Sequence, residues 1–378
     1  MTEGGVLAEY DVYCSNCGKT YGKGTLLWRC ECGSPLDIKI KTYGKFSIEK
    51  ENYSMWRYKS LLPSIKPENI TSLKEGFTPI VERNVAGIKI WYKLDFLNPT
   101  GSFKDRGASM LVSYLREQGI REVVEDSSGN AGAALSAYCS VAGIKCKVFV
   151  PASAPEGKIK QISSYGAEVI PVEGSREDVN KAALKAARKS YYAGHLWNPF
   201  FIEGLKTISF EVYEMTGGRV PDTILVPVGS GGLLIGIYKG FRELKEAGYL
   251  DHLPRLIGIQ TPRFARVYEL LYNKKVRSKS EAILADGIAV PDPPRAHQVA
   301  RIIEETEGKI ILVYNEEIAQ GFKELARMGL YVEPTSATVQ AAFRKLLSEK
   351  FISRGEAVLA PLTGIGLKAT DKIIRYMG

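Results

Sequence analysis

A lysine in a turn-rich segment is the first residue whose type and place could do chemistry. Lys104 lies within residues 98–107, which read NPTGSFKDRG and follow an alternating apolar stretch, residues 88–94, typical of a strand. A strand, a Pro/Gly turn and a helix start place Lys104 at the rim of an α/β sheet, where ligands usually bind. A lysine held there away from water has its ammonium destabilised and its amine made nucleophilic. Gly107 and Ala108 are small enough for another helix to pack closely behind it.

A lone lysine at a helix start is more often simply solvated, so the neighbouring motifs decide between the two interpretations. Two loops share the same strand–loop–helix order. The first follows the apolar Val123-Val124 and consists of Ser127, Ser128, Gly129 and Asn130. The second follows the strand-like residues 223–226 and consists of Gly229, Ser230, Gly231, Gly232 and Leu233. Such loops expose backbone N–H groups at a positive helix end, which suits a phosphate or a carboxylate, although either loop alone could be a plain tight turn.

Four of the six cysteines form two close pairs near the amino terminus. The pairs are Cys14 with Cys17 and Cys30 with Cys32, and a glycine follows the second cysteine of each pair, as in zinc knuckles. Because the second pair is one residue shorter than the usual spacing, two interpretations stay open. The residues either hold a structural zinc ion or form a knuckle that packing alone maintains. Cys139 and Cys146 lie in apolar settings and are expected to be buried thiols.

Length and composition indicate a soluble globular enzyme. The 378 residues, 45% apolar and 25% charged, suffice for two domains and a small extension. No apolar run is long enough for a membrane span, and residues 1–5 lack a signal pattern, so we expect a cytoplasmic protein without a membrane partner. The net charge of +9 could indicate nucleic acid, and a zinc-ribbon nucleic-acid binder is the rival interpretation. The basic residues are interleaved with acids, however, which is typical of solvated helix surface, so we expect no nucleic-acid partner.

Apolar runs alternate with helical patterns along most of the chain, which predicts parallel sheets with helices on both faces. Clear strand-like runs are residues 145–150, 168–172, 255–260 and 357–360. We predict four parts. They are a zinc-ribbon-like extension (1–40), a linker with part of a large domain (41–100), a smaller α/β domain (101–205) and the large α/β domain (206–378).

The lysine motif and both loops together resemble pyridoxal-phosphate enzymes of the tryptophan-synthase-β type, known as fold type II. Further segments resemble threonine synthases, and these are residues 73–79, 198–199, 203–207, 285–289, 333–337 and 362–368. The resemblance implies two doubly wound domains with largely parallel sheets, the cofactor pyridoxal 5'-phosphate, a small amino-acid substrate and a homodimer. It also implies a lyase that converts O-phosphohomoserine and water to threonine and phosphate.

The resemblance further implies a role for each motif. Lys104 is the Schiff-base lysine and then the acid and base that moves protons at the substrate. Asn130 bonds the phenolic oxygen of the cofactor, and Thr363 meets its pyridine nitrogen, although Thr363 could also be an ordinary turn residue before Gly364. The cofactor phosphate is held by Gly229, Ser230, Gly231, Gly232 and Leu233. The substrate carboxylate is held by Ser127, Ser128 and Gly129.

Residue 201 differs from the threonine synthase pattern at a position that helps to determine which substrate binds. Threonine synthases commonly have an arginine near the Asn-Pro pair, suited to a phosphate ester, whereas here Phe201 follows Phe200. The glycine loop is also closer to that of dehydratases and cysteine synthases. A threonine or serine dehydratase, or a cysteine- or cysteate-forming β-replacement enzyme, is therefore the alternative. If the substrate is phosphorylated, another cation has to replace the arginine, and the candidates are Arg106, Lys158, Lys160 and His195.

Overall fold

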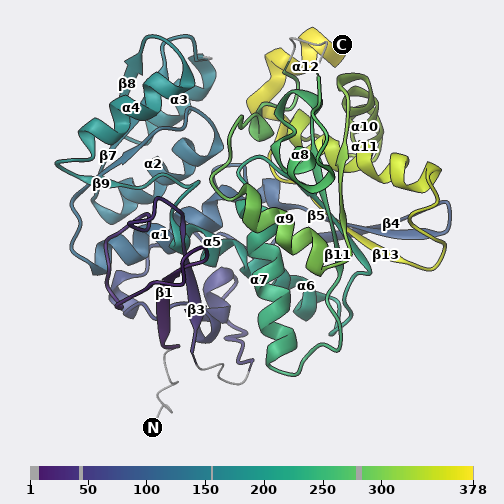
Figure 1. Cartoon of the computed structure of the whole chain (residues 1–378), viewed down its shortest axis with the longest axis horizontal. Coiled ribbons are helices and arrows are strands. Elements are labelled where there is room, and N and C mark those ends of the chain that lie inside the picture. Colours follow the sequence, from purple (N-terminus) through teal and green to yellow (C-terminus); the bar gives the residue numbers. More distant parts are fainter. Residues whose placement is uncertain (1–7, 42–45, 155, 278–282, 378) are drawn as a thin grey trace. The chain divides into compact units, whose positions relative to one another are not determined.

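The computed structural model describes residues 8–41, 46–154, 156–277 and 283–377 (Figure 1). Contacts group the chain into two compact units, each built from two stretches. Unit 1 comprises Met1–Phe77 with Lys104–Thr207, and unit 2 comprises Thr78–Phe103 with Ile208–Gly378. The backbone therefore enters unit 1 for the second time at Lys104 itself. The four-part domain division stays a prediction.

Unit 1 begins with a small antiparallel sheet in the order β2-β1-β3, here called the ribbon sheet. Its strands are β1 (Tyr10–Cys14), β2 (Thr20–Tyr21) and β3 (Leu36–Ile40). The short helical turns η1 (Met55–Leu61) and η2 (Pro67–Asn69) follow it. The ribbon sheet packs on the rest of unit 1 through aromatic contacts, because the ring of Tyr10 meets the ring of Phe200 edge-on at 5.8 Å.

The second sheet of unit 1 is fully parallel, in the order β8-β7-β6-β9. Its strands are β6 (Glu122–Glu125), β7 (Lys145–Pro151), β8 (Glu168–Val172) and β9 (Tyr191–Tyr192). The helices of the unit are α1 (Lys104–Glu117), α2 (Asn130–Ala142), α3 (Glu156–Ser164), α4 (Arg176–Ala186) and α5 (Pro199–Leu205). On the face covered by α4, Val124 and Phe149 pack with Val179 and Ala183. Cys139 and Cys146 are buried, as the sequence predicted.

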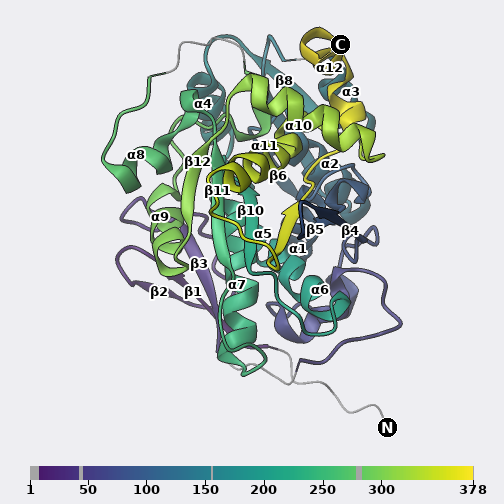
Figure 2. The ribbon, with the colours of Figure 1, turned by 90° about the vertical axis from the view of Figure 1, so that its right-hand side faces the viewer.

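Unit 2 contains one six-stranded sheet in the order β12-β11-β10-β13-β5-β4 (Figure 2). All neighbours are parallel except β4, which pairs antiparallel with β5 at one edge. The strands are β4 (Ile80–Val85), β5 (Ile88–Lys93), β10 (Thr223–Pro227), β11 (Arg255–Gln260), β12 (Lys309–Leu312) and β13 (Ala357–Pro361). The strand-like runs found in the sequence are confirmed here and in unit 1, whereas β4 and β12 were not identified beforehand.

Helices cover both faces of this sheet. They are α6 (Thr207–Met215), α7 (Gly232–Glu246), α8 (Arg266–Tyr272), α9 (Ala296–Glu305), α10 (Asn315–Arg327), α11 (Pro334–Ser348) and α12 (Thr370–Met377). Single turns at η3 (Asp95–Leu97), η4 (Pro262–Phe264), η5 (Asp286–Ile288) and η6 (Gly366–Ala369) connect them. Ile257 belongs to the core that α10 and α11 cover, whereas a Cβ on its neighbour Gly258 would lie 3.6 Å from Leu234 of α7. Successive strand residues point to opposite faces, so α7 lies on the face opposite α10 and α11.

Two glycines allow α1 and α5 to approach closely within unit 1. A Cβ on Gly107 would lie 2.3 Å from the ring of Phe201, and a Cβ on Gly204 would lie 2.0 Å from the carbonyl oxygen of Arg106. A side chain at Gly204 would force the backbones of the two helices apart, and one at Gly107 would displace the ring of Phe201. The expected close packing behind Lys104 is therefore confirmed, and its partner is α5.

The predicted fold class is confirmed as α/β with largely parallel sheets and a small antiparallel extension. Because parallel strands end at one edge, the segments after β5, β10 and β13 start from one edge of the sheet in unit 2. The segments after β6 and β9 do the same in unit 1. Among the described residues, no helix has the length and apolar character that crossing a membrane requires.

Candidate functional site

In unit 2, the segment before Lys104 is bound to the segment after β13. Phe103 N–H donates to Thr363 O at 3.0 Å, and Ile365 N–H donates to Gly101 O at 3.0 Å. Between these bonds, Ser102 pairs with Gly364 as an isolated antiparallel bridge. The residue that precedes Lys104 in the chain is thus fixed directly against Thr363.

Ser336 of α11 determines how the hydroxyl of Thr363 can act. The Ser336 Oγ accepts hydrogen bonds from the backbone N–H groups of Thr363 and Gly364, both at 2.9 Å. It also lies 2.9 Å from Thr363 Oγ1 and 3.3 Å from Gly364 O. Two accepted bonds fill the lone pairs of a hydroxyl oxygen, so Ser336 has to donate its own proton, and Thr363 Oγ1 is the nearer acceptor. The buried hydroxyl of Thr363 is then left with a hydrogen to donate.

The glycine loop of unit 2 lies between the end of β10 and the start of α7. Gly231 caps the helix with a φ of +89°, a conformation that favours glycine. A Cβ on Gly231 would lie 2.3 Å from Val299, and one on Gly229 would lie 2.9 Å from the backbone of Ile288. The first N–H groups of a helix have no acceptor within the helix, so α7 presents donors there. This arrangement suits a phosphate.

A buried hydroxyl in the segment before Lys104 has no hydrogen-bond partner among the described residues. Ser102 is fully buried, and its Oγ forms no hydrogen bond with any residue that the structure describes. A buried hydroxyl without a partner is costly, which indicates that a polar group from outside the chain is expected there. The donors of unit 2, which are the N–H groups at the start of α7 and the hydroxyls of Ser102 and Thr363, therefore suit the polar groups of pyridoxal phosphate.

In unit 1, Lys104 is the first residue of α1 and is partly buried. Its Nζ lies 5.6 Å from the centre of the Phe201 ring. Phe201 is buried and fills the contact between α1 and α5. Asn198 caps α5 by accepting the N–H of Phe200 at 3.0 Å, which explains the Asn-Pro pair of the motif. The ring of Phe201 thus fills space beside the lysine at the position where the family resemblance expects a cation.

The loop that follows β6 in unit 1 carries the residues expected to hold a carboxylate. Gly129 caps α2, and Asn130 is the first residue of that helix. The Ser127 side chain accepts the N–H of Gly129 at 3.3 Å. The loop lies so close to α2 that a Cβ on Gly132 would lie 2.0 Å from Ser127 O. Ser128, Gly129 and Asn130 are partly exposed, so their polar groups are accessible.

The sequence reasoning missed a buried carboxylate at this edge of unit 1. Glu125 is the last residue of β6 and is fully buried. Its Oε1 lies 3.1 Å from Nδ1 of His195, which follows β9. A charged residue ending an apolar strand, two residues before the Ser-Ser-Gly-Asn loop, was the signal that could have indicated it.

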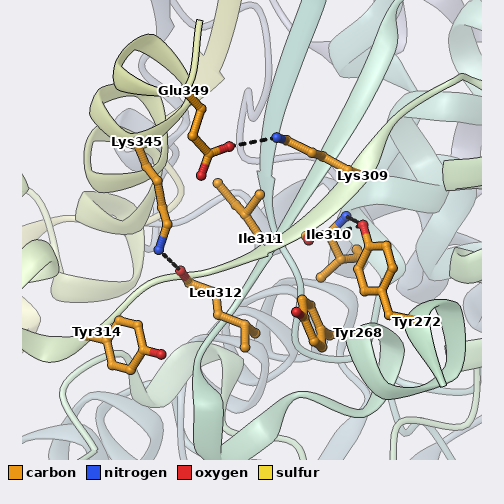
Figure 3. Close-up of a pocket in the computed structure, with 9 residues that line it drawn as sticks. All are labelled: Tyr268, Tyr272, Lys309, Ile310, Ile311, Leu312, Tyr314, Lys345 and Glu349. Atoms are coloured by element: carbon orange, nitrogen blue, oxygen red, sulfur yellow. Dashed lines mark hydrogen bonds and ion pairs between the residues drawn. The ribbon is translucent and has the colours of Figure 1, made fainter. Parts of the chain in front are cut away.

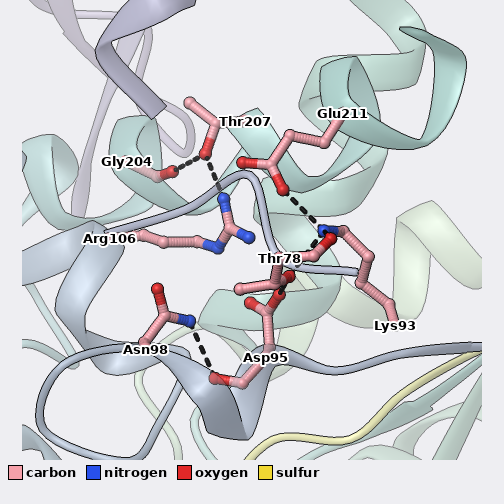
Figure 4. Close-up of polar contacts among 8 residues, drawn as sticks. All are labelled: Thr78, Lys93, Asp95, Asn98, Arg106, Gly204, Thr207 and Glu211. Atoms are coloured by element: carbon pink, nitrogen blue, oxygen red, sulfur yellow. Dashed lines mark hydrogen bonds and ion pairs between the residues drawn. The ribbon is translucent and has the colours of Figure 1, made fainter. Parts of the chain in front are cut away.

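The four cations considered as phosphate partners differ in their surroundings. Arg106 is fully buried, and its Nη1 donates to Thr207 Oγ1 at 3.0 Å (Figure 4). Lys160 is exposed on α3 and pairs with Glu156 at 2.9 Å. Lys158 is on the same helix as Lys160. Burial of the His195 ring lowers its pKa well below its usual range. Arg106 is therefore engaged inside unit 1, and the role of each of the four cations as a phosphate partner stays a prediction.

The four clustered cysteines lie together as a metal site requires. Their sulfur atoms all lie within 4.8 Å of one another. Cys14 Sγ is 3.6 Å from Cys32 Sγ, and Cys17 Sγ is 3.5 Å from Cys30 Sγ. A tetrahedral zinc site with Zn–S bonds of about 2.3 Å places its sulfurs roughly 3.8 Å apart, so the cluster has the size of such a site. The glycines that follow each pair both have positive φ, as the knuckle interpretation requires.

A cavity of about 340 Å³ lies in unit 2 and shares no residue with the candidate site (Figure 3). It is lined by Tyr268, Tyr272, Lys309, Ile310, Ile311, Leu312, Tyr314, Lys345 and Glu349. Several of its polar groups satisfy the free edge of β12. The Tyr272 hydroxyl accepts the N–H of Ile310 at 3.1 Å, and Lys345 Nζ donates to Leu312 O at 3.0 Å. The cavity is thus part of how the sheet edge is covered.

Comparison with known proteins gives a consistent result. A family model described as pyridoxal-phosphate dependent enzyme matches residues 71–364. The threonine synthase of Methanocaldococcus jannaschii is 37% identical and covers 96% of this chain and 94% of its own. The threonine synthase of Methanosarcina acetivorans is 34% identical, with 97% and 94% covered.

Solved structures show the same fold. A serine racemase from Dictyostelium discoideum has a TM-score of 0.63 and 30% identity, covering 76% of this chain and 92% of its own. A pyridoxal 5'-phosphate-dependent aspartate racemase has a TM-score of 0.65 and 26% identity, with 76% and 90% covered. A threonine deaminase from Solanum lycopersicum has a TM-score of 0.68 at 21% identity, with 80% and 83% covered, and shows the fold alone.

We predict that Ser336→Ala lowers the free energy of unfolding by about 1–3 kcal/mol, because two buried N–H groups lose their acceptor. Chemical denaturation measures this change. Ser348→Ala is the matched control on the same helix, since its hydroxyl is exposed, and its effect should stay within about 0.5 kcal/mol. Equal effects of the two substitutions would contradict the role assigned to Ser336.

Proposed function

The chain belongs to the threonine synthase family of pyridoxal-phosphate-dependent enzymes, and from this premise we propose that it converts O-phosphohomoserine and water to threonine and phosphate. The geometric observation that supports the proposal most is the bond between Phe103 and Thr363. It fixes the segment that leads to Lys104 against the backbone of Thr363, whose hydroxyl we propose as the partner of the pyridine nitrogen. The buried, unpartnered Ser102 lies in the same segment.

In this proposal each motif has one task. Lys104 binds the cofactor covalently, and Asn130 bonds its phenolic oxygen. The phosphate of the cofactor is bound by Gly229, Ser230, Gly231, Gly232 and Leu233, and its pyridine nitrogen by Thr363. The substrate carboxylate is bound by Ser127, Ser128 and Gly129. Bound pyridoxal phosphate supplies an electron sink for the bond broken at the substrate α-carbon.

The protein residues then move protons. The amine of Lys104 takes the α-proton and then a β-proton of the substrate, after which the γ-phosphate leaves. Water adds at the β-carbon, and Lys104 returns protons to the substrate carbons. The neutral hydroxyl of Thr363 leaves the pyridine nitrogen unprotonated, as its hydrogen-bonding geometry supports.

We expect purified protein to release phosphate and threonine in equal amounts from O-phosphohomoserine. The test offers O-phosphohomoserine, threonine and O-phosphoserine separately and measures phosphate, 2-oxobutyrate and threonine. Lys104→Ala should lose turnover and the yellow absorbance, whereas the control Lys147→Ala removes a lysine of β7 that pairs with Glu122 and should keep both. Ammonia and 2-oxobutyrate from threonine, with O-phosphohomoserine untouched, would instead support the dehydratase, which the neutral Phe201 favours. A colourless protein that takes up no cofactor but shifts DNA would reject the enzyme altogether.

We propose that the four clustered cysteines hold a structural zinc ion. Four thiolates fill the tetrahedral shell and leave no open position for chemistry. The amino-terminal extension also contacts α5 and α1, since the ring of Tyr10 in β1 meets that of Phe200 and the Tyr114 hydroxyl donates to Thr25 O, between β2 and β3, at 2.6 Å. Loss of the metal should therefore weaken the packing of unit 1 and leave chemistry in the folded fraction unchanged.

We predict about one zinc per wild-type chain and none in the double variant Cys14→Ser/Cys17→Ser, which should melt at a lower temperature. Metal analysis and thermal unfolding measure both quantities. Cys146→Ser is the control, because it removes a buried thiol outside the cluster and should keep the zinc. Unchanged melting of the double variant together with a selective loss of turnover would contradict a structural role.

We further propose a cytoplasmic homodimer, on the family resemblance alone. Sedimentation velocity at micromolar concentration should give twice the mass of the chain. A monomer under these conditions would reject the dimer.

A further inference from the structure

A buried carboxylate and an imidazole form a pair at the carboxyl edge of the sheet in unit 1. Strands β6 and β9 are parallel neighbours, so Glu125 and the segment with His195 leave the sheet side by side. Glu125 Oε1 lies 3.1 Å from His195 Nδ1, and Glu125 Oε2 accepts the backbone N–H of His195 at 3.3 Å. The carboxyl group therefore binds both the ring and the backbone of the same histidine.

This contact leaves one nitrogen of the imidazole open. With Nδ1 bound to Glu125, Nε2 has no hydrogen-bond partner among the residues that the structure describes. The His195 side chain is only 9% exposed. When Glu125 is ionised, Nδ1 carries the imidazole proton and donates it to the carboxylate, so Nε2 keeps a free lone pair.

Lys104 and this pair flank the same aromatic ring. The Phe201 ring lies 5.7 Å from the His195 ring and 5.6 Å from Lys104 Nζ, so both groups flank the same aromatic side chain. Burial raises the pKa of Glu125 to about 7, and the bond from His195 and the Lys104 ammonium partly oppose this rise. Burial is also the main reason that the pKa of His195 is lowered, and Lys104 lowers it further.

Other charged and titratable groups face the pair from each neighbouring element. They are Asp126 of the loop after β6, Arg176 of α4, Tyr192 of β9 and Cys139 of α2. The Asp126 carboxyl group is engaged by Asn180 at 2.7 Å and by the Tyr192 hydroxyl at 3.1 Å. Arg176 favours an ionised Glu125, as Lys104 does, but Lys104 alone among these groups changes its charge during the proposed reaction.

We propose that Glu125 and His195 are positioning residues that hold a proton for Lys104 and set the pH at which Lys104 becomes a free base. When Lys104 is cationic, Glu125 is ionised and stabilises it. When Lys104 loses a proton, an N–H bond of its ammonium breaks, and the pair takes up one proton on the carboxyl group or on Nε2. No oxidant or reductant takes part, and the summed charge of the three groups stays constant. The inference rests on the role proposed for Lys104.

The test is a pH titration of the absorbance of the holoenzyme, which reports protonation at the cofactor-bound Lys104. We expect Glu125→Gln to move the midpoint down by about one pH unit, the size of effect that one neighbouring opposite charge produces. The acid limb of kcat/KM should move in the same direction. Glu125→Asp, which keeps the charge, should restore part of the shift. Glu122→Gln is the matched control at the other end of β6 and should leave the midpoint unchanged.

A purely structural role would give a different result. Glu125→Gln and Glu125→Asp would then both lower the melting temperature and leave the midpoint in place, which would overturn the proposal. A second signature comes from stability. Because the pKa of Glu125 is higher in the folded chain, the wild type loses stability as pH rises from about 4.5 to about 7, and Glu125→Gln removes this loss.

The proposal can also be tested if the protein does not bind the cofactor. The rate at which an acylating reagent modifies Lys104, followed by mass spectrometry across pH, reports the fraction of free amine without any cofactor. Glu125→Gln should shift this profile to lower pH as well. A shift in a protein that fails the threonine assay would support this inference and reject the proposed function, whereas an unchanged profile would reject the inference alone.

Discussion

Helix α5 can reach helix α1 only because Gly204 lacks a side chain, since a Cβ there would lie 2.0 Å from the carbonyl oxygen of Arg106. The close approach lets Arg106 donate to Thr207, whose hydroxyl in turn donates to Gly204 O at 2.7 Å. It also brings Phe201 against Gly107, one turn of helix from Lys104. The residues that the family motifs share at these positions thus serve the contact between two helices, and this contact decides what surrounds the lysine.

A buried ion pair binds the residue at which the chain first passes from unit 1 into unit 2. In unit 2, Lys93 Nζ lies 2.6 Å from Glu211 and donates to Thr78, the first residue after the earliest crossing (Figure 4). Thr78 in turn donates to Asp95 at 2.7 Å. Removing one member of a buried ion pair typically costs about 3–5 kcal/mol, because the remaining charge keeps its desolvation penalty. Such clusters fix the conformation of particular segments more than they add net stability.

The parts of the fold that depend on local patterns could be predicted from the sequence, and those that depend on distant contacts could not. The strands, the glycine after each cysteine pair and the small residue at Gly107 follow from short-range rules. The bond from Ser336 to Thr363 joins residues 27 positions apart, and that from Glu125 to His195 joins residues 70 apart. Neither local sequence indicates which distant residue its side chain will contact. These contacts depend on which strands are neighbours in the sheet, and the local sequence does not specify the strand order.

Phe201 and the Glu125–His195 pair are best understood as one feature. An arginine at position 201 would place a second positive charge beside Lys104, and like charges disfavour the ammonium form. It would also favour ionisation of Glu125 and so remove the capacity of the pair to take up a proton near neutral pH. A neutral, buried ring instead keeps the dielectric around Lys104 low and leaves Glu125 as the group that responds to its charge. Because Phe201 stands where the family commonly has an arginine, Glu125 is left to influence the charge of Lys104.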